Sequence, residues 1–258
     1  MTNRVLEGKV ALITGASGGL GAHFADVLAD AGATVALAAR RIALVEAKAA
    51  EIKARGGKAV ALALDVGDAE AIGPAMDKIE AELGPLSIMI NNAGVGGEGL
   101  ALDISIEQWD QTFNVNVRGV FLGAREAARR MIASGVAARG EARIVNIGSI
   151  HSFEPKGGLA AYCGSKAAVT MITKVLAREW ARHQIAVNAI CPGYIETDIN
   201  ADWFKTEGGE KQKKSFPRRR LAEASDLDAT LLMLSGPAAR AITGISITID
   251  DGQSLAGA

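Results

Sequence analysis

The sequence predicts an α/β fold, in which a parallel seven-stranded sheet carries helices on both faces. Seven short runs rich in Val, Ile, Leu and Ala recur along the chain, at residues 9–14, 33–39, 59–66, 86–92, 142–148, 185–192 and 244–250. Nearly continuous apolar runs are typical of strands that are covered on both faces. Longer segments with apolar residues at helical spacing alternate with these runs, which indicates parallel strands joined by crossover helices.

The helical segments are bounded by recognisable stop signals. Residues 20–32, 43–57 and 69–84 each end at glycine, a frequent helix terminator. Because no linker, repeat or change of composition divides the chain, we expect residues 1–258 to form one doubly wound domain. Residues 193–224 form an unusually long connection, and we expect such a segment to be a substrate lid.

Composition excludes several classes of function. The 258 residues carry a formal net charge of −1, which gives no global basic field for nucleic acid or an anionic membrane. Two cysteines and three histidines make a disulfide scaffold or a zinc site improbable. The chain shows neither a signal peptide nor an apolar run of ~18 residues. We therefore expect a cytoplasmic protein without a metal, nucleic-acid or membrane partner.

A glycine-rich stretch, "TGASGGLG", follows the first predicted strand and opens a helix. Glycines let the backbone approach a pyrophosphate closely, and the helix N-terminus offers unpaired N–H groups to it. The spacing G-x-x-x-G-x-G differs from the common dinucleotide fingerprint, and a tight strand–helix turn is the plain alternative. We expect nucleotide contacts from Gly15, Ser17, Gly19, Leu20 and Gly21.

The end of the second predicted strand indicates which nucleotide is bound. An acidic residue there would hold the ribose 2′-hydroxyl of NAD, but the strand ends at Ala39 and is followed by Arg40 and Arg41. A guanidinium suits a 2′-phosphate, which favours NADP(H) over NAD(H), although a solvated arginine pair is the alternative. Asp65 and Val66 end the third strand near the expected adenine; Asp65 could instead cap a helix.

Candidate catalytic residues follow the fifth strand. Tyr162 and Lys166 are spaced four apart, which places them on one face of a helix. Ser149 comes 13 residues before Tyr162, directly after a predicted strand. Ligands of open parallel sheets bind beyond the carboxyl ends of the strands, so these three side chains are predicted to meet at that edge.

Taken in order, "TGASGGLG" (14–21), "NNAG" (91–94), "NVNVRG" (114–119), Ser149, "YCGSK" (162–166) and "PGYIET" (192–197) resemble the short-chain dehydrogenase/reductase family, in particular its 3-oxoacyl-reductase-like members. The resemblance implies a Rossmann-like fold and hydride transfer between NADP(H) and a ketone or secondary alcohol. Two alternatives stay open: an NAD-dependent alcohol dehydrogenase with the same site, and a nucleotide-binding sensor without turnover.

The resemblance also implies roles for individual residues. Tyr162 would be the general acid for reduction and the base for oxidation, and Lys166 would lower the pKa of its phenol. Ser149 would bind the substrate carbonyl. Asn116 would hold a water that links Lys166 to solvent, with Asn114 as a near alternative. Each of these residues also has an ordinary structural reading, as a turn serine, a helix-bend asparagine or a surface lysine.

Further residues are implied to bind the cofactor together with Tyr162 and Lys166; they are Thr14, Asn92, Ala93, Gly94, Pro192, Gly193, Ile195 and Thr197. The family usually forms tetramers or dimers. The resemblance would place one interface on helices 105–135 and 161–183 and another on the C-terminal segment.

Substrate selection is expected from loops around the site. His151 and Phe153 follow Ser149, and Trp203 and Phe204 lie in the predicted lid, although loop polarity and ordinary packing would also explain them. The lid carries seven basic residues: Lys205, Lys211, Lys213, Lys214, Arg218, Arg219 and Arg220. They suggest an anionic substrate such as an acyl thioester, but a solvated charged face is the stronger alternative.

Overall fold

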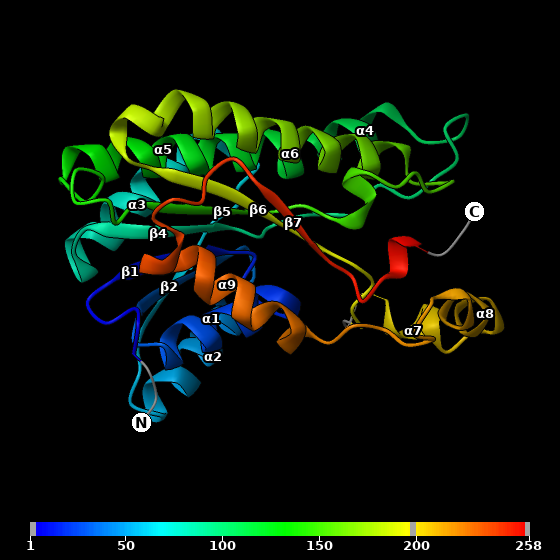
Figure 1. Ribbon diagram of the computed structural model, residues 1–258, viewed down its shortest axis with the longest axis horizontal. Helices are drawn as coiled ribbons and strands as arrows, with labels where there is room; N and C mark the ends of the chain where they lie inside the picture. Colours follow the sequence, from blue (N-terminus) through cyan, green and yellow to red (C-terminus); the bar gives the residue numbers. More distant parts are fainter. Residues whose placement is uncertain (1–3, 197–199, 256–258) are drawn as a thin grey trace.

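The computed structural model describes residues 4–196 and 200–255, and a seven-stranded sheet forms its centre (Figure 1). The strands are β1 (Val10–Thr14), β2 (Thr34–Ala39), β3 (Lys58–Ala63), β4 (Leu86–Asn91), β5 (Arg143–Ile147), β6 (Ala186–Pro192) and β7 (Ser246–Ile249). They pair in parallel in the order β3-β2-β1-β4-β5-β6-β7. The predicted α/β fold is therefore confirmed.

The strand order places a crevice at the centre of the sheet. From β1 the chain builds β2 and β3 to one side, and β4 then returns to the other side of β1. The crossovers after β1 and after β4 leave the sheet on opposite faces, so their ends diverge beyond the carboxyl ends of these two strands. This topology creates the place where a nucleotide would bind.

Helices cover both faces of the sheet (Figure 1). One face carries α1 (Gly19–Asp30), α2 (Ile42–Ala54) and α9 (Asp228–Ser235), and the other carries α3 (Ala69–Leu83), α5 (Val120–Ala133) and α6 (Ala160–Trp180). Alternate residues of β1 enter the two cores, with Ile13 in the first and Leu12 in the second. Burial on both faces explains why the strands are continuously apolar.

A buried polar chain fixes α6 on the sheet. Asn91 of β4 donates to Asn146 of β5 at 2.8 Å, and Asn146 donates to Thr173 of α6 at 2.9 Å. Thr173 in turn donates to the carbonyl of Val169 at 2.8 Å. Because an unpaired amide inside a core is costly, this chain fixes the helix at one height along the strands. Its position determines where Tyr162 and Lys166 meet the strand ends.

The long connection after β6 contains helices in place of the predicted loop. Its described part includes α7 (Ala201–Phe204) and α8 (Glu207–Ser215), which lie beyond the carboxyl edge of the sheet (Figure 1). Thr206 caps α8 by accepting a hydrogen bond from the Gly209 amide at 3.1 Å. Within residues 4–196 and 200–255, no helix is both long enough and apolar enough to span a bilayer.

Gly21 provides a test of how tightly the first strand–helix turn is packed. A Cβ at this position would overlap the Gly15 carbonyl and lie 2.6 Å from Asn92 Nδ2. We expect Gly21→Ala to lower the free energy of unfolding by about 1–3 kcal/mol in urea titrations. Gly157→Ala is the matched control, because a Cβ there meets nothing within 4 Å. Equal stabilities of the two variants would contradict the packing argument.

Candidate active site

Thr14 and Asn92 join the ends of the two central strands. The buried Thr14 hydroxyl accepts hydrogen bonds from the amides of Asn92 and Ala93, both at 3.1 Å. The Asn92 side chain donates to the Thr14 carbonyl at 2.9 Å and reaches the Gly15 carbonyl at 3.4 Å. These predicted cofactor residues therefore fix the crevice between β1 and β4.

Glycines in the first loop allow these segments to approach. A Cβ on Gly15 would lie 2.8 Å from the Ala93 Cα atom, and the φ angle of Gly15 is +69°. Helix α1 then begins after Gly18 without a side-chain cap. Its first N–H groups and its positive dipole end point to the crevice, where a pyrophosphate would fit.

Arg41 contacts the same loop from the end of β2. Its guanidinium donates to the Ser17 hydroxyl at 2.9 Å, and both Arg40 and Arg41 are exposed. Asp65 does not cap the next helix: that cap is Asp68, whose carboxylate accepts from the Glu70 amide at 3.0 Å. Asp65 instead accepts from the Gly67 amide at 2.9 Å. The arginines thus flank the place expected for a ribose 2′-phosphate.

Tyr162 lies in the first turn of α6 and is partly buried beside Ser149. Burial raises the pKa of the Tyr162 phenol, and a hydrogen bond with the Ser149 side chain acts in the opposite direction. The predicted lowering of this pKa is therefore wrong for this structure, because desolvation of the phenolate exceeds the stabilising contacts. The Ser149 hydroxyl accepts a hydrogen bond from the His151 amide at 3.1 Å, which fixes its position.

Lys166 directs its ammonium to the end of β5 and not to the phenol. The Nζ atom donates to the Ile147 carbonyl at 2.8 Å and lies 5.6 Å from the centre of the Tyr162 ring. Only 5% of Lys166 is exposed, and burial lowers the pKa of its ammonium to about 8. Lys166 is thus a buried titratable group with its charge state poised near neutral pH.

Asn116 lies in a π-helix (Asn114–Gly119) that interrupts the helical run between α4 (Ile106–Phe113) and α5. Its side chain pairs with the backbone of Val95, accepting from the amide at 2.8 Å and donating to the carbonyl at 2.9 Å. It also donates to the Ser165 hydroxyl at 3.0 Å. Asn114 instead donates to the Gly67 carbonyl at 3.1 Å, away from these groups.

Gly94 marks the point where Asn116 and Lys166 converge. A Cβ on Gly94 would lie 3.3 Å from Asn116 Oδ1 and 3.6 Å from Lys166 Nζ. The π-helix therefore brings Asn116, rather than Asn114, toward the lysine, and π-helical turns are frequent at functional sites. The sequence indicated the choice of asparagine but not the π-helix.

Gln253, which sequence reasoning missed, fixes the conformation of the loop after β6. The buried Gln253 accepts from the Tyr194 amide at 2.5 Å and donates to the Tyr194 carbonyl at 3.1 Å. Gly193 permits this contact, because a Cβ there would overlap Gln253 and lie 2.7 Å from Asp250 Cβ. Pro192 ends β6 and Ile195 is buried, whereas Thr197 lies outside the described residues.

Aromatic side chains form a wall beside Tyr162. The buried His151 ring packs edge-on against Tyr162, with 6.3 Å between ring centres, and against Tyr194 at 5.5 Å. Tyr194 stacks on Phe216 at 5.5 Å and meets the edge of Phe204 at 5.9 Å. Sequence reasoning missed Tyr194, although it comes two residues after Pro192, the last residue of β6.

Two predicted pocket residues lie elsewhere. Trp203 is half exposed and folds onto α8, where its indole donates to Gln212 at 2.9 Å. Phe153 is also half exposed and lines a separate hollow of about 360 Å³ with Leu255. Each side chain therefore lies largely at the surface and not inside a closed pocket.

Much of the basic charge in the predicted lid is neutralised locally. Lys205 pairs with Asp202 at 3.0 Å, and Lys213 pairs with Glu210 at 2.5 Å. Arg218 and Arg220 both pair with Asp251, at 2.6 and 2.8 Å. These ion pairs favour the charged-face alternative over attraction of an anionic substrate.

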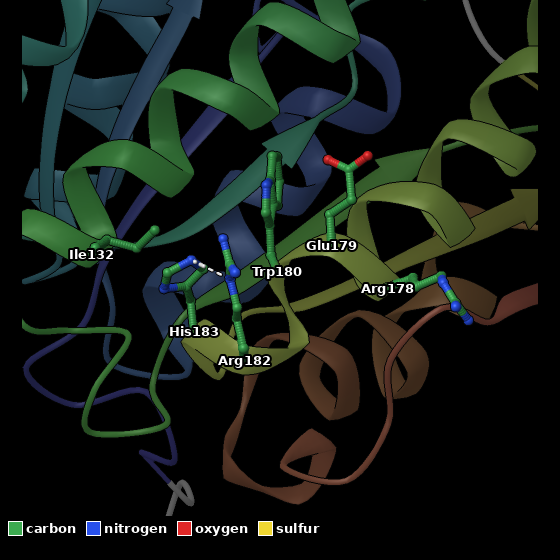
Figure 2. Close-up of a pocket in the computed structure, with 6 residues that line it drawn as sticks. All are labelled: Ile132, Arg178, Glu179, Trp180, Arg182 and His183. Carbon is green, nitrogen blue, oxygen red and sulfur yellow. Dashed lines mark hydrogen bonds between the residues drawn. The ribbon is translucent and has the colours of Figure 1, made fainter.

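A surface hollow of about 590 Å³ is remote from this site (Figure 2). It lies at the far end of α6, where Trp180 is about 27 Å from Tyr162 at 1.5 Å per residue. In Figure 2, Arg182 and His183 line it and contact each other at 3.3 Å. Within the described residues, no cluster of three His, Cys, Asp or Glu side chains could hold a metal ion.

Comparisons with known proteins agree with this geometry. The chain is 37% identical over 265 residues to the 2,3-dihydro-2,3-dihydroxybenzoate dehydrogenase of Bacillus subtilis (strain 168), with 99% of each chain covered. It is 34% identical over 250 residues to the D-threitol dehydrogenase of Mycolicibacterium smegmatis (strain ATCC 700084 / mc(2)155), covering 97% of this chain and 94% of the relative.

A solved structure shares both the sequence and the fold. The gluconate 5-dehydrogenase from Burkholderia cenocepacia J2315, in complex with NADP and tartrate, superposes with a TM-score of 0.92 at 31% identity and 99% coverage of both chains. The family model described as short chain dehydrogenase matches residues 9–208. With its parallel sheet and central crevice, this chain belongs to the short-chain dehydrogenase/reductase family of oxidoreductases.

Proposed function

We propose that this oxidoreductase interconverts a secondary alcohol and a ketone with NADP(H), using Tyr162 as the proton donor and acceptor. The observation that carries the proposal is the position of Tyr162 and the buried Lys166 one helical turn apart, beside Ser149 and at the carboxyl edge of the sheet. The bound cofactor supplies or accepts the hydride.

Tyr162 handles the proton at the reacting oxygen. In reduction its phenol donates to the developing alkoxide, and a raised pKa keeps the phenol protonated at neutral pH. Oxidation uses the phenolate as base. Ser149, held by the His151 amide, donates a second hydrogen bond to the same oxygen and stabilises its charge.

Lys166 and Asn116 are proposed to bind the cofactor and to connect the site with solvent. The ammonium of Lys166 would bind the ribose hydroxyls of the cofactor. Asn116 Oδ1 faces Gly94, as Lys166 Nζ does, which supports a water-mediated proton path between them. Both residues occupy fixed positions, because Ile147 and Val95 hold them through backbone hydrogen bonds.

The crevice fits a phosphorylated dinucleotide. Gly15, Ser17, Gly19, Leu20 and Gly21 would hold the pyrophosphate at the start of α1, and Arg40 and Arg41 would bind the 2′-phosphate. The contact between Arg41 and Ser17 places a guanidinium at this loop, which supports NADP(H) over NAD(H). Asp65 and Val66 would flank the adenine, and Asn92, Ala93, Gly94, Pro192, Gly193, Ile195 and Thr197 would line the remainder.

The substrate is proposed to be a small hydroxylated molecule. The relatives named above carry dehydrogenase names for a dihydrodiol and for a four-carbon polyol.

A homotetramer or homodimer is the proposed assembly. Helices α4, α5 and α6 expose large apolar side chains on one side of the molecule, where a second copy would bury them; they are Ile106, Trp109, Phe121, Ile132, Met171 and Val175. Large apolar side chains exposed on neighbouring helices are typical of protein interfaces.

Tyr162→Phe tests the chemistry. Loss of the phenolic proton is expected to lower kcat by about 10²–10⁴-fold for D-threitol, gluconate or 2,3-butanediol, while NADPH still binds in a fluorescence titration. Lys166→Met should also lower kcat, whereas the exposed Lys174→Met, two turns along the same helix, should not. A Tyr162→Phe enzyme that retains wild-type turnover would overturn the mechanism.

Arg41→Ala tests the cofactor. Losing charge-assisted bonds to the 2′-phosphate should raise the Kd for NADPH about tenfold to a hundredfold. The Kd of the same variant for NADH serves as its internal control and should stay near the wild-type value. A wild-type enzyme that binds NADH more tightly than NADPH would contradict the assignment.

Met171→Glu tests the assembly. A charge on the exposed face of α6 should prevent burial against a second copy and shift the species seen by light scattering toward the monomer. Lys53→Glu, at an exposed position of α2 on the opposite face of the sheet, is the matched control. A monomeric wild-type protein at micromolar concentration would refute the proposed assembly.

A further inference from the structure

Four side chains beside the site form a continuous chain of hydrogen bonds that the proposed reaction does not use. The Trp203 indole of α7 donates to Gln212 Oε1 of α8 at 2.9 Å. Burial raises the pKa of the Tyr194 phenol, and a hydrogen bond with the Gln212 side chain acts in the opposite direction. The Tyr194 hydroxyl lies 3.0 Å from His151 Nε2, and His151 Nδ1 lies 3.0 Å from the Glu154 carbonyl.

The two ends of the chain fix the direction of every bond. An indole nitrogen can only donate, and a backbone carbonyl can only accept. His151 must therefore carry its proton on Nδ1, so that a neutral ring accepts from Tyr194 at Nε2. The Gln212 amide accepts with its oxygen and donates with its nitrogen. Every member then has the donor or acceptor that its neighbour requires.

Packing makes the chain a connection between separate elements. Tyr194 is held between Phe216 and the edge of Phe204, so its hydroxyl has a fixed direction. The His151 backbone amide donates to Ser149, and the His151 ring packs against Tyr162. The chain thus joins α7 and α8 to the loop that carries the proposed catalytic serine.

We propose that His151 and Tyr194 are positioning residues, which fasten α7 and α8 over the substrate through this one-directional chain and thereby set substrate affinity. The inference rests on the proposed function for its kinetic consequence and on structure alone for the fastening. Fastening requires a neutral His151. A protonated ring donates from both nitrogens, so the Tyr194 oxygen would face two donors and the phenol proton would lose its acceptor in the chain.

The groups around His151 define the pH range in which the chain holds. Burial lowers the pKa of His151, the Glu154 carbonyl and carboxylate raise it, and Lys156 lowers it further; Tyr162 and Tyr194 are the neutral groups that face the ring. Because the net direction is downward from 6.5, the ring is neutral at pH 7. The chain should hold above pH 6.5 and weaken as the pH falls through the lowered pKa.

Trypsin provides a test that needs no turnover. Helix α8 and its flanks contain Lys205, Lys211, Lys213 and Lys214, and cleavage there reports release of this segment. At pH 8, Tyr194→Phe keeps the stacked rings but removes the donor, and should be cleaved in 205–220 about threefold to tenfold faster than the wild type. An unchanged cleavage rate would overturn the fastening.

Kinetics test the effect on substrate affinity. For the best alcohol among D-threitol, gluconate and 2,3-butanediol, Tyr194→Phe should raise KM about threefold to tenfold at pH 7.5 and leave kcat within about twofold. The wild-type KM should rise below pH 6.5, and the KM of Tyr194→Phe should not. His151→Gln, which keeps an acceptor that does not titrate, should show a pH-independent KM.

The remote histidine supplies the control. His183→Gln, at the far end of α6, should retain the wild-type pH profile. A variant Tyr194→Phe that loses kcat but not substrate affinity would refute a positioning role. If none of these alcohols is oxidised but cleavage accelerates, the proposed function fails and the fastening stands.

Discussion

The buried ammonium of Lys166 is the constraint around which the site is arranged. A charge withdrawn from water is costly unless a polar group replaces the solvent. Here the replacement is the Ile147 carbonyl, which is available because β5 ends there. Because compensation by one carbonyl is partial, the pKa of Lys166 falls to about 8. The end of β5 provides the carbonyl that accepts from Lys166, α6 carries Lys166 to it, and Gly94 leaves space beside the ammonium.

The two halves of the site are built differently. The nucleotide half depends on backbone contacts between β1, β4 and the glycine loop, with Thr14 and Asn92 as the side chains that join them. The substrate half depends on side-chain rings, in which His151 and Tyr194 pack against each other and onto Phe204 and Phe216. Side-chain contacts can be changed without moving the sheet, so substrate choice is separable from cofactor binding.

Sequence reasoning located most of the fold and of the candidate site, because both follow local patterns. Continuous apolar runs predicted the parallel strands, and ordered motifs predicted which residues meet at their ends. What it missed depends on distant contacts: the π-helix places Asn116 against Val95, and Gln253 closes the loop at Tyr194 from 59 residues away. The direction of the Tyr162 pKa was also missed, since spacing does not encode burial.

The contact of Gln253 with Tyr194 has a consequence for how the site comes into being. Strands β1 to β6 and their helices precede residue 194, and they can pair as they emerge during synthesis. The loop after β6 obtains its lasting conformation only when residue 253 has been added and folded back. A nascent chain can therefore hold six paired strands while the loop at Tyr194 still awaits its last partner.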